Sequence, residues 1–209
     1  APELLVDLHN NTGHNPAYAV GPVADDAHRR IAALFGRYFV QSDLRLGALV
    51  EATERDFPSV TVECGRAGAP EADAVARTGL DRLLALDALP PASPGALALL
   101  VEPVRVEVVP GASLAIGDAP VAGADLTVSA DVDRHNFQPL APGVPIGWVR
   151  DDAPCPLVAR GAAGDDLSHA YFRRVAGRLE VRRELVPIMM TTDPAIARSD
   201  CLFYIVRPR

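Results

Sequence analysis

The apolar and polar positions of the chain follow two different periods, and they predict an α/β part followed by a mostly β part. Residues 3–9 and 59–65 (SVTVECG) are short apolar runs that predict buried strands. Residues 24–40 and 69–89 carry apolar side chains at helical spacing and predict amphipathic helices. The segment 10–22 is rich in Gly, Asn and Pro and predicts a loop. The order β-α-β-α is typical of an α/β layer fold.

Local signals support both helices. Asp25 or Asp26 can cap the first helix, and Pro70 suits the first turn of the second. His28 is expected on the solvated face of the first helix. The residues expected to form the two core stripes are Ile31, Leu34, Phe35, Tyr38, Val75, Leu80, Leu83 and Leu84.

The pattern changes after the segment 89–95 (LPPASPG), which predicts a linker. Short alternating runs separated by Gly, Pro and Asp follow it and predict strands. These runs are 104–110, 112–117, 125–132, 144–150, 178–185 and 201–206. We therefore expect an α/β catalytic-type domain at 1–90 and a mostly β domain at 96–209.

Composition limits the classes of protein to which the chain can belong. It has 209 residues, of which 49% are apolar, so it can bury a sizeable core. The formal charge of −7 argues against binding to nucleic acid or to an anionic membrane surface. No apolar run approaches the roughly 20 residues of a membrane-spanning helix, and no signal peptide is visible. A small molecule is the expected partner, and a homo-oligomer stays open.

Cysteine and lysine usage narrow the chemistry further. Cys64, Cys155 and Cys201 are too few and too scattered for a disulfide framework, which favours the reducing cytoplasm. All 20 basic residues are Arg, so this chain offers no lysine for a Schiff base, a P-loop or a Ser-Lys dyad. Ala1 stands almost at the start of the first strand, so we expect the chain to be a piece of a longer protein.

Ionisable side chains lie at the ends of both predicted strands. Asp7 and His9 are two residues apart, so they share one face of the first strand, and Glu63 lies near the carboxyl end of the second. Ligands of open α/β sheets bind outside the carboxyl ends of strands, so neighbouring strands would bring His9 and Glu63 to one pocket. A carboxylate beside an imidazole can orient it as a metal ligand. Asn10 and Asn11 follow directly, where amide donors can hold an anionic substrate.

A structural explanation competes with this functional one. An Asp-x-His at a strand end is often a satisfied polar terminus in which the Asp caps a turn. A Glu at a strand end is often simply solvated. The spacing by itself therefore leaves both a metal role and a purely structural role open.

Four stretches resemble the succinylglutamate desuccinylase/aspartoacylase family, whose members have a zinc-carboxypeptidase-like α/β/α fold. They are VDLHNNTG at 6–13, PSVTVECG at 58–65, ADVDRHNFQPLAPGVPIG at 130–147 and VPIMMTT at 186–192. The stretches follow one another in the family's order and span nearly the whole chain. The resemblance implies part of such an α/β/α domain, followed by a mostly β module.

The resemblance also implies roles for individual residues. His9 matches the family's third zinc ligand, and Asp7 would bind the ring nitrogen of His9 that does not bind zinc. Glu63 matches the carboxylate that activates the attacking water and passes its proton to the leaving amine. Asn10 and Asn11 stand where the family lines its pocket. The implied cofactor is Zn²⁺, and the implied reaction is hydrolysis of a small linear amide such as an N-acyl amino acid.

The chain departs from the family pattern in two places. The family's other two zinc ligands lie in a G-x-H-G-x-E motif upstream of Ala1, and a catalytic zinc ion normally takes three protein ligands. His14, in the loop, is an alternative ligand. Some relatives use a Tyr near the C-terminus, and the comparable stretch 191–200 (TTDPAIARSD) has none. Arg66, directly after ECG, is a further candidate for binding a substrate carboxylate.

Three hypotheses about function remain. The first is a zinc-dependent amidohydrolase with His9 as a ligand and Glu63 as the general base. The second is a catalytically inactive, metal-free binding or assembly domain that keeps the fold. A serine or cysteine hydrolase is disfavoured, because the chain has no G-x-S-x-G and its cysteines lack a catalytic partner.

Overall fold

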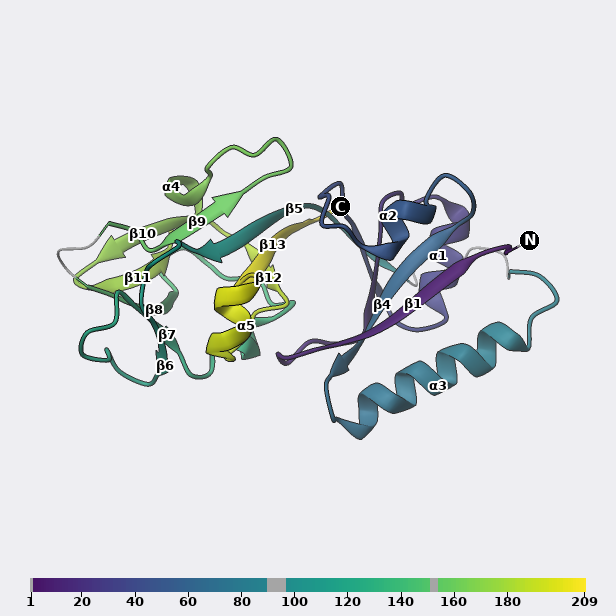
Figure 1. Cartoon of the computed structure of the whole chain (residues 1–209), viewed down its shortest axis with the longest axis horizontal. Coiled ribbons are helices and arrows are strands. Elements are labelled where there is room, and N and C mark those ends of the chain that lie inside the picture. The colour runs from purple at the N-terminus through teal and green to yellow at the C-terminus, as the bar shows by residue number, and fades with distance from the viewer. Residues whose placement is uncertain (1, 90–96, 151–153) are drawn as a thin grey trace. The chain divides into compact units, whose positions relative to one another are not determined.

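The computed structural model of the chain describes residues 2–89, 97–150 and 154–209 (Figure 1). The chain divides into two compact units, and each contains segments from distant parts of the sequence. Unit 1 comprises Ala1–Asn11, Pro16–Pro103 and Arg207–Arg209, and unit 2 comprises Thr12–Asn15 and Val104–Val206. Within the described residues, no helix is both long and apolar enough to cross a membrane.

Unit 1 is built on a mixed sheet with the strand order β1-β4-β2-β3-β5. These strands are β1 (Leu5–Asn11), β2 (Tyr18–Gly21), β3 (Tyr38–Gln41), β4 (Ser59–Arg66) and β5 (Ala98–Val108). β1 pairs parallel with β4, and β2 runs antiparallel to β4 but parallel with β3, which is in turn parallel with β5. The carboxyl ends of β1 and β4 therefore point toward one end of the strands, and those of β2 and β3 point toward the opposite end.

Three helices accompany this sheet, namely α1 (Asp26–Ala33), α2 (Leu49–Thr53) and α3 (Pro70–Leu84). Both α1 and α3 pack against β4, and the apolar face of the sheet is buried between them and the strands. Asp25 caps α1 by accepting a hydrogen bond from the His28 backbone N–H at 3.0 Å. The capping prediction is confirmed, as are the strands at 3–9 and 59–65 and the helix from Pro70.

The first predicted helix is too long, because α1 ends at Ala33 and Tyr38 begins the short strand β3. The run Tyr38–Gln41 is aromatic and β-branched, and it is stabilised by parallel pairing on both sides, with β2 and with β5. The predicted loop at 10–22 likewise contains β2, which pairs with β4. Both corrections share one cause, since sheet pairing between distant segments overrides the local pattern.

Two predictions about exposure in the helices are also wrong. His28 is buried at 3% exposure, because its Nε2 accepts a hydrogen bond from Ser59 N–H at 3.3 Å and its Nδ1 lies 2.7 Å from Asp25 Oδ1. Leu84, expected in the core, is 81% exposed. The buried residues of α3 are the small Ala72 and Gly79, so this helix approaches the core through small side chains.

Unit 2 is mostly β, as predicted. Its strands outside β5 are β6 (Leu114–Gly117), β7 (Leu126–Ser129), β8 (Pro145–Val149), β9 (Leu157–Arg160), β10 (Phe172–Val175), β11 (Arg178–Val181), β12 (Val186–Ile188) and β13 (Phe203–Pro208). Five form a sheet in the order β10-β11-β8-β7-β6, while β9 pairs with β5 and β12 pairs with β13. Short helices are the 3₁₀ helix Val132–His135, α4 (Ser168–Tyr171) and α5 (Pro194–Ser199). All six predicted runs contain strand residues.

The boundary between the units differs from a simple cut between 1–90 and 96–209. Residues 90–95 of the predicted linker lie outside the described residues. Beyond them, β5 begins in unit 1 and continues into unit 2, and β13 returns from unit 2 to unit 1. The short segment Thr12–Asn15 belongs to unit 2, where Thr12 Oγ1 lies 2.7 Å from Thr191 Oγ1.

Candidate active site

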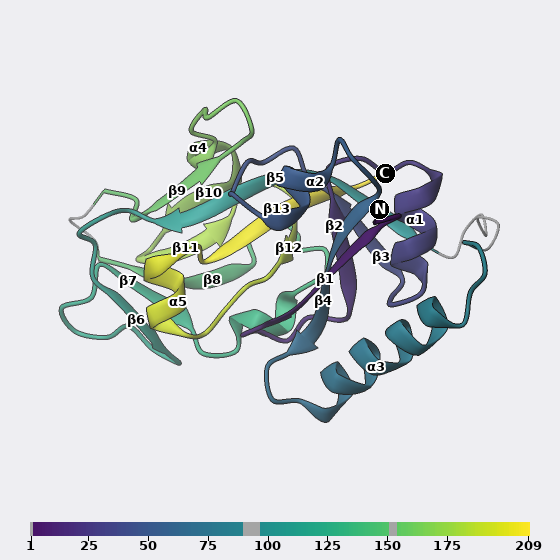
Figure 2. The same ribbon diagram turned by 45° about the vertical axis from the view of Figure 1, so that its right-hand side comes forward.

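The parallel pairing of β1 and β4 brings the predicted site residues together (Figures 1 and 2). The register places His9 directly beside Glu63, and it shifts between His9 and Asn11 at the end of the pairing. Both strands form because their apolar runs pack into the core of unit 1, with Val60 and Val62 fully buried. The sheet therefore delivers an imidazole and a carboxylate to the same edge.

Asp7 orients the His9 imidazole from the same face of β1, as the period of two predicts. His9 Nε2 lies 3.1 Å from Asp7 Oδ2, and its Nδ1 lies 3.8 Å from Glu63 Oε1. The His9 side chain is 50% exposed, whereas the carboxylates are more enclosed. An imidazole held at Nε2 by a carboxylate presents Nδ1 as its second nitrogen, which is the arrangement of a metal-binding histidine.

Glu63 is a buried carboxylate, only 6% exposed, at the carboxyl end of β4. Burial raises the pKa of Glu63 above its usual value, and the nearby Asp7 charge adds to this effect, while His9 and a hydrogen bond from Asn11 oppose it. That hydrogen bond runs from Asn11 Nδ2 to Glu63 Oε2 at 3.4 Å. A carboxylate with a raised pKa can take up and hold a proton closer to neutral pH, as a general base must.

A glycine lies where the β1–β4 register shifts after Glu63. Gly65 has φ +131°, a conformation that side-chain-bearing residues rarely adopt, and a Cβ there would lie 3.4 Å from the Cβ of Ala72. β4 nevertheless continues through it to Arg66, which pairs with Asn11 after the register has shifted by one residue. Gly65 thus lets the strand keep its pairing past the catalytic candidate while α3 lies close behind it.

The remaining predicted residues differ in their placement. Asn11 is buried and contacts Glu63, whereas Asn10 and Arg66 are exposed on the same unit. His14, the alternative ligand, belongs to unit 2, where its Nδ1 lies 2.7 Å from Oδ2 of the buried Asp133. The His14 backbone N–H also donates to that oxygen at 3.2 Å. The Nδ1 of His14 therefore faces Asp133 within unit 2.

The sequence did not single out Asp133 as this partner, although it lies in the stretch 130–147 that carries the family resemblance. The neighbouring Asn136 of the same stretch is structural, because its amide accepts from Met190 N–H at 2.7 Å and donates to Met190 O at 3.0 Å. These two bonds tie the 3₁₀ helix to the segment after β12. No local sequence pattern indicates the partner of His14, because 119 residues separate it from Asp133.

The donor set fits one ligand position of a zinc site. Across the described ranges, no group of three or more His, Cys, Asp or Glu side chains is arranged to hold a metal ion. His9 supplies one imidazole nitrogen of the type that zinc prefers, and a catalytic zinc ion normally takes three protein ligands. These residues would supply one ligand of a zinc site, and such a site would need two further ligands from elsewhere.

Fold and residue cluster together define an α/β protein with an Asp–His–Glu cluster where two parallel strands end. Its fold is that of the succinylglutamate desuccinylase/aspartoacylase family, as the resemblance predicted. A succinylglutamate desuccinylase/aspartoacylase from Rhodobacter sphaeroides is 14% identical, with a TM-score of 0.52 over 99% of this chain and 59% of that one. A succinylglutamate desuccinylase from Vibrio parahaemolyticus is 14% identical, with a TM-score of 0.56 over 97% and 53%.

The likeness concerns structure rather than close sequence kinship. No protein-family model and no curated protein matches the sequence. The chain spans 53% of the Vibrio protein and 59% of the Rhodobacter protein, so it corresponds to a little over half of each.

Proposed function

We propose that the protein is a zinc-dependent hydrolase that cleaves the amide bond of an N-acyl amino acid or a similar small amide. The observation that carries this proposal is the contact between His9 Nδ1 and the carboxylate of Glu63, which is buried and has a raised pKa. The fold supports it, because structures that share the fold are described as desuccinylases and aspartoacylases. We also propose a cytoplasmic location, which the free state of Cys64, Cys155 and Cys201 supports.

In this proposal each residue of the cluster has a distinct task. Asp7 holds Nε2 of His9, so Nδ1 becomes the ligating atom. Glu63 takes the proton of the attacking water on its carboxylate and delivers it to the leaving amine. Asn11 fixes one carboxylate oxygen of Glu63 by its hydrogen bond, which leaves Oε1 on the His9 side for the proton. A bound zinc ion would polarise the acyl carbonyl and make the water more acidic.

Substrate binding falls to the exposed polar groups nearby in unit 1. Arg66 offers a guanidinium that suits a substrate carboxylate, and Asn10 offers an amide. Asn11 was predicted to contact substrate, but its Nδ2 donates to Glu63, so we propose a positioning role for it instead. The two further zinc ligands would come from the upstream G-x-H-G-x-E segment that the family resemblance implies.

The alternative is a metal-free binding or assembly domain. One observation favours it, since the described residues hold no group of three metal-binding side chains. A buried carboxylate with a raised pKa has no evident use in such a domain, so we prefer the hydrolase.

The test combines metal content with turnover. The full-length protein, with whatever segment precedes Ala1, is assayed by elemental analysis for zinc and by amine release from N-succinyl-L-glutamate and a panel of N-acetyl-L-amino acids. The Glu63→Gln variant should keep its zinc and lose at least about 10³-fold in kcat, as expected for a general base. The matched control is Glu71→Gln, on the exposed first turn of α3. Unchanged turnover in Glu63→Gln would remove the general-base role, and a zinc-free protein would favour the binding domain.

A further inference from the structure

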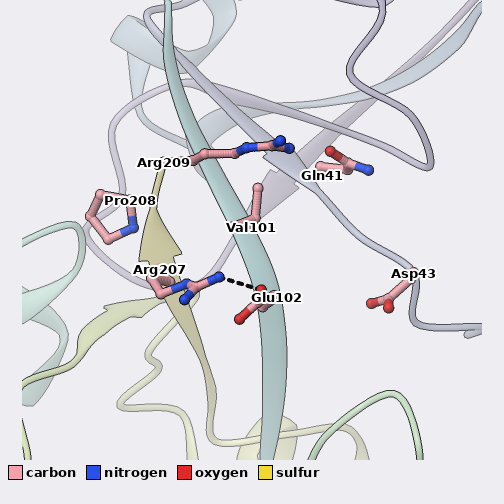
Figure 3. Close-up of a pocket in the computed structure, with 7 residues that line it drawn as sticks. All are labelled: Gln41, Asp43, Val101, Glu102, Arg207, Pro208 and Arg209. Carbon is pink, nitrogen blue, oxygen red and sulfur yellow. Dashed lines mark hydrogen bonds and ion pairs between the residues drawn. The ribbon is translucent and has the colours of Figure 1, made fainter.

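Unit 1 contains a cavity whose lining residues do not belong to the Asp–His–Glu cluster; Figure 3 shows these residues. It measures about 480 Å³, and its walls come from the end of β3, the middle of β5 and the end of β13. The lining residues are Gln41, Asp43, Val101, Glu102, Arg207, Pro208 and Arg209. Because β3 runs opposite to β1 and β4, its carboxyl end faces the other edge of the sheet from His9 and Glu63. The volume falls within the range of small-molecule sites.

Two charges of this cavity neutralise each other. Arg207 and Glu102 form an ion pair across neighbouring strands (Figure 3). Glu102 has φ +56° although it is not a glycine, and it precedes Pro103, which normally forces an extended backbone. Strained backbone of this kind clusters at active sites and ligand-binding sites. Here the strained backbone places the Glu102 carboxylate at the cavity, where it holds Arg207 in place.

Two further charges remain available to a ligand. The backbone N–H of Arg209 donates to Leu99 O at 3.0 Å, but among the described residues neither the Arg209 nor the Asp43 side chain has a hydrogen-bond or ion-pair partner. Asp43 acts on Arg45 only electrostatically, and the Arg45 guanidinium is itself paired with Glu54 at 2.9 Å. Figure 3 shows Arg209 and Asp43 on different sides of the cavity, with the Gln41 amide between them. The cavity therefore offers one positive, one negative and one neutral polar group.

We propose that this cavity binds a small zwitterion, and that the ligand belongs to the class of free α-amino acids. The carboxylate of the ligand pairs with Arg209, its ammonium group pairs with Asp43, and the Gln41 amide bonds to either. A phosphate is a poor fit, because Asp43 and Glu102 would repel a polyanion. The buried Val101 side chain provides an apolar floor for a short ligand side chain. The assignment does not depend on the hydrolase function.

Isothermal titration calorimetry tests it directly. L-alanine is titrated into the protein, with acetate, methylammonium and inorganic phosphate as single-charge or anionic probes. We expect saturable binding of L-alanine and binding at least about tenfold weaker for acetate and methylammonium. Arg209→Gln and Asp43→Asn should each weaken L-alanine binding by at least about tenfold. The matched control Arg77→Gln, on the exposed face of α3, should bind like the wild type.

Three results would overturn the proposal. The first is the absence of saturable heat for L-alanine at millimolar concentrations. The second is tighter binding of phosphate than of L-alanine, which would define an anion site. The third is undiminished L-alanine binding in both pocket variants, which would place the amino acid elsewhere on the chain. Thermal melts verify that each variant is folded, and the two variants on separate segments guard against a local folding defect.

Discussion

Asn11 donates a hydrogen bond from Nδ2 to Oε2 of Glu63 at 3.4 Å, across 52 residues of sequence. Both residues are buried at 6% exposure, on neighbouring parallel strands. Because the bond favours the ionised carboxylate, it opposes the burial that raises the pKa of Glu63. Burial and the Asp7 charge raise the pKa of the proposed general base, while His9 and this Asn11 donor lower it.

Removing the donor should therefore raise the pKa of Glu63 further. In Asn11→Ala, burial acts with one opposing interaction fewer, and the unpartnered carboxylate oxygen should also cost about 1–3 kcal/mol of stability at neutral pH. A ¹³C NMR titration of the Glu63 carboxyl carbon measures the shift. Asn10→Ala, at the exposed neighbouring position, is the control and should leave the pKa where it is. An equal or lower pKa in Asn11→Ala would contradict this account.

Glu63→Gln should stabilise the protein, and more so at neutral than at acidic pH. The raised pKa means that the folded state holds the Glu63 proton where the unfolded chain has released it. The wild type therefore loses stability as pH rises above the unfolded pKa near 4.5, until the folded pKa has been passed. The neutral amide avoids this loss, so we expect a gain of about 1 kcal/mol at pH near 7. Denaturant unfolding at acidic and neutral pH, with Glu71→Gln as control, would expose the opposite trend.

Asp7→Asn should weaken zinc binding if His9 is a ligand. The Asp7 carboxylate lies 3.1 Å from Nε2 of His9, and such a partner makes the imidazole more basic and therefore a stronger metal ligand. Loss of such a partner typically lowers metal affinity by about 10–100-fold. Competition with a chromophoric chelator measures the affinity, and Asp81→Asn on the exposed face of α3 is the control. Equal affinities in the variant and the wild type would show that Asp7 does not act through His9.

Gly13→Ala should destabilise unit 2. An added Cβ would lie 2.1 Å from Met190 O, a backbone atom that cannot move cheaply because Asn136 holds both sides of Met190. The expected loss is about 2–4 kcal/mol in the free energy of unfolding. Gly117→Ala is a matched control, since its nearest neighbour would lie at 3.4 Å. A change of less than about 0.5 kcal/mol in Gly13→Ala would mean that the segment 12–15 packs less tightly than the structure shows.

A single thiol should react in the native protein. Cys64 and Cys201 are buried, while Cys155 is partly exposed. Burial raises the pKa of Cys201 to about 12 and also raises the pKa of Cys64, so both remain thiols at about pH 8. Ellman's reagent should therefore titrate one thiol in the native protein and all 3 in denaturant. Loss of the fast native reaction in Cys155→Ser would assign that thiol, and two fast thiols would mean that one buried site opens readily.

The features that the sequence determined are those with a local cause. The apolar runs at 3–9 and 59–65 predict strands, because a short continuous run of apolar side chains is stable when it is buried in a sheet. The period of two alone places Asp7 and His9 on one face, and the structure has them 3.1 Å apart. Pro70 marks the start of α3 for an equally local reason, since its fixed φ suits a first helical turn.

Tertiary structure decided everything that depends on pairing between distant segments. The contact between His9 and Glu63 requires β1 and β4 to be parallel neighbours in one register, which no periodicity specifies. Pairing with β2 and β5 likewise turns Tyr38–Gln41 into a strand, against its helical spacing. His14 lies in a polar loop, yet Asp133 binds it from across the chain. Such contacts gain their energy only when the whole sheet forms, so a local pattern can indicate candidates but cannot choose their partners.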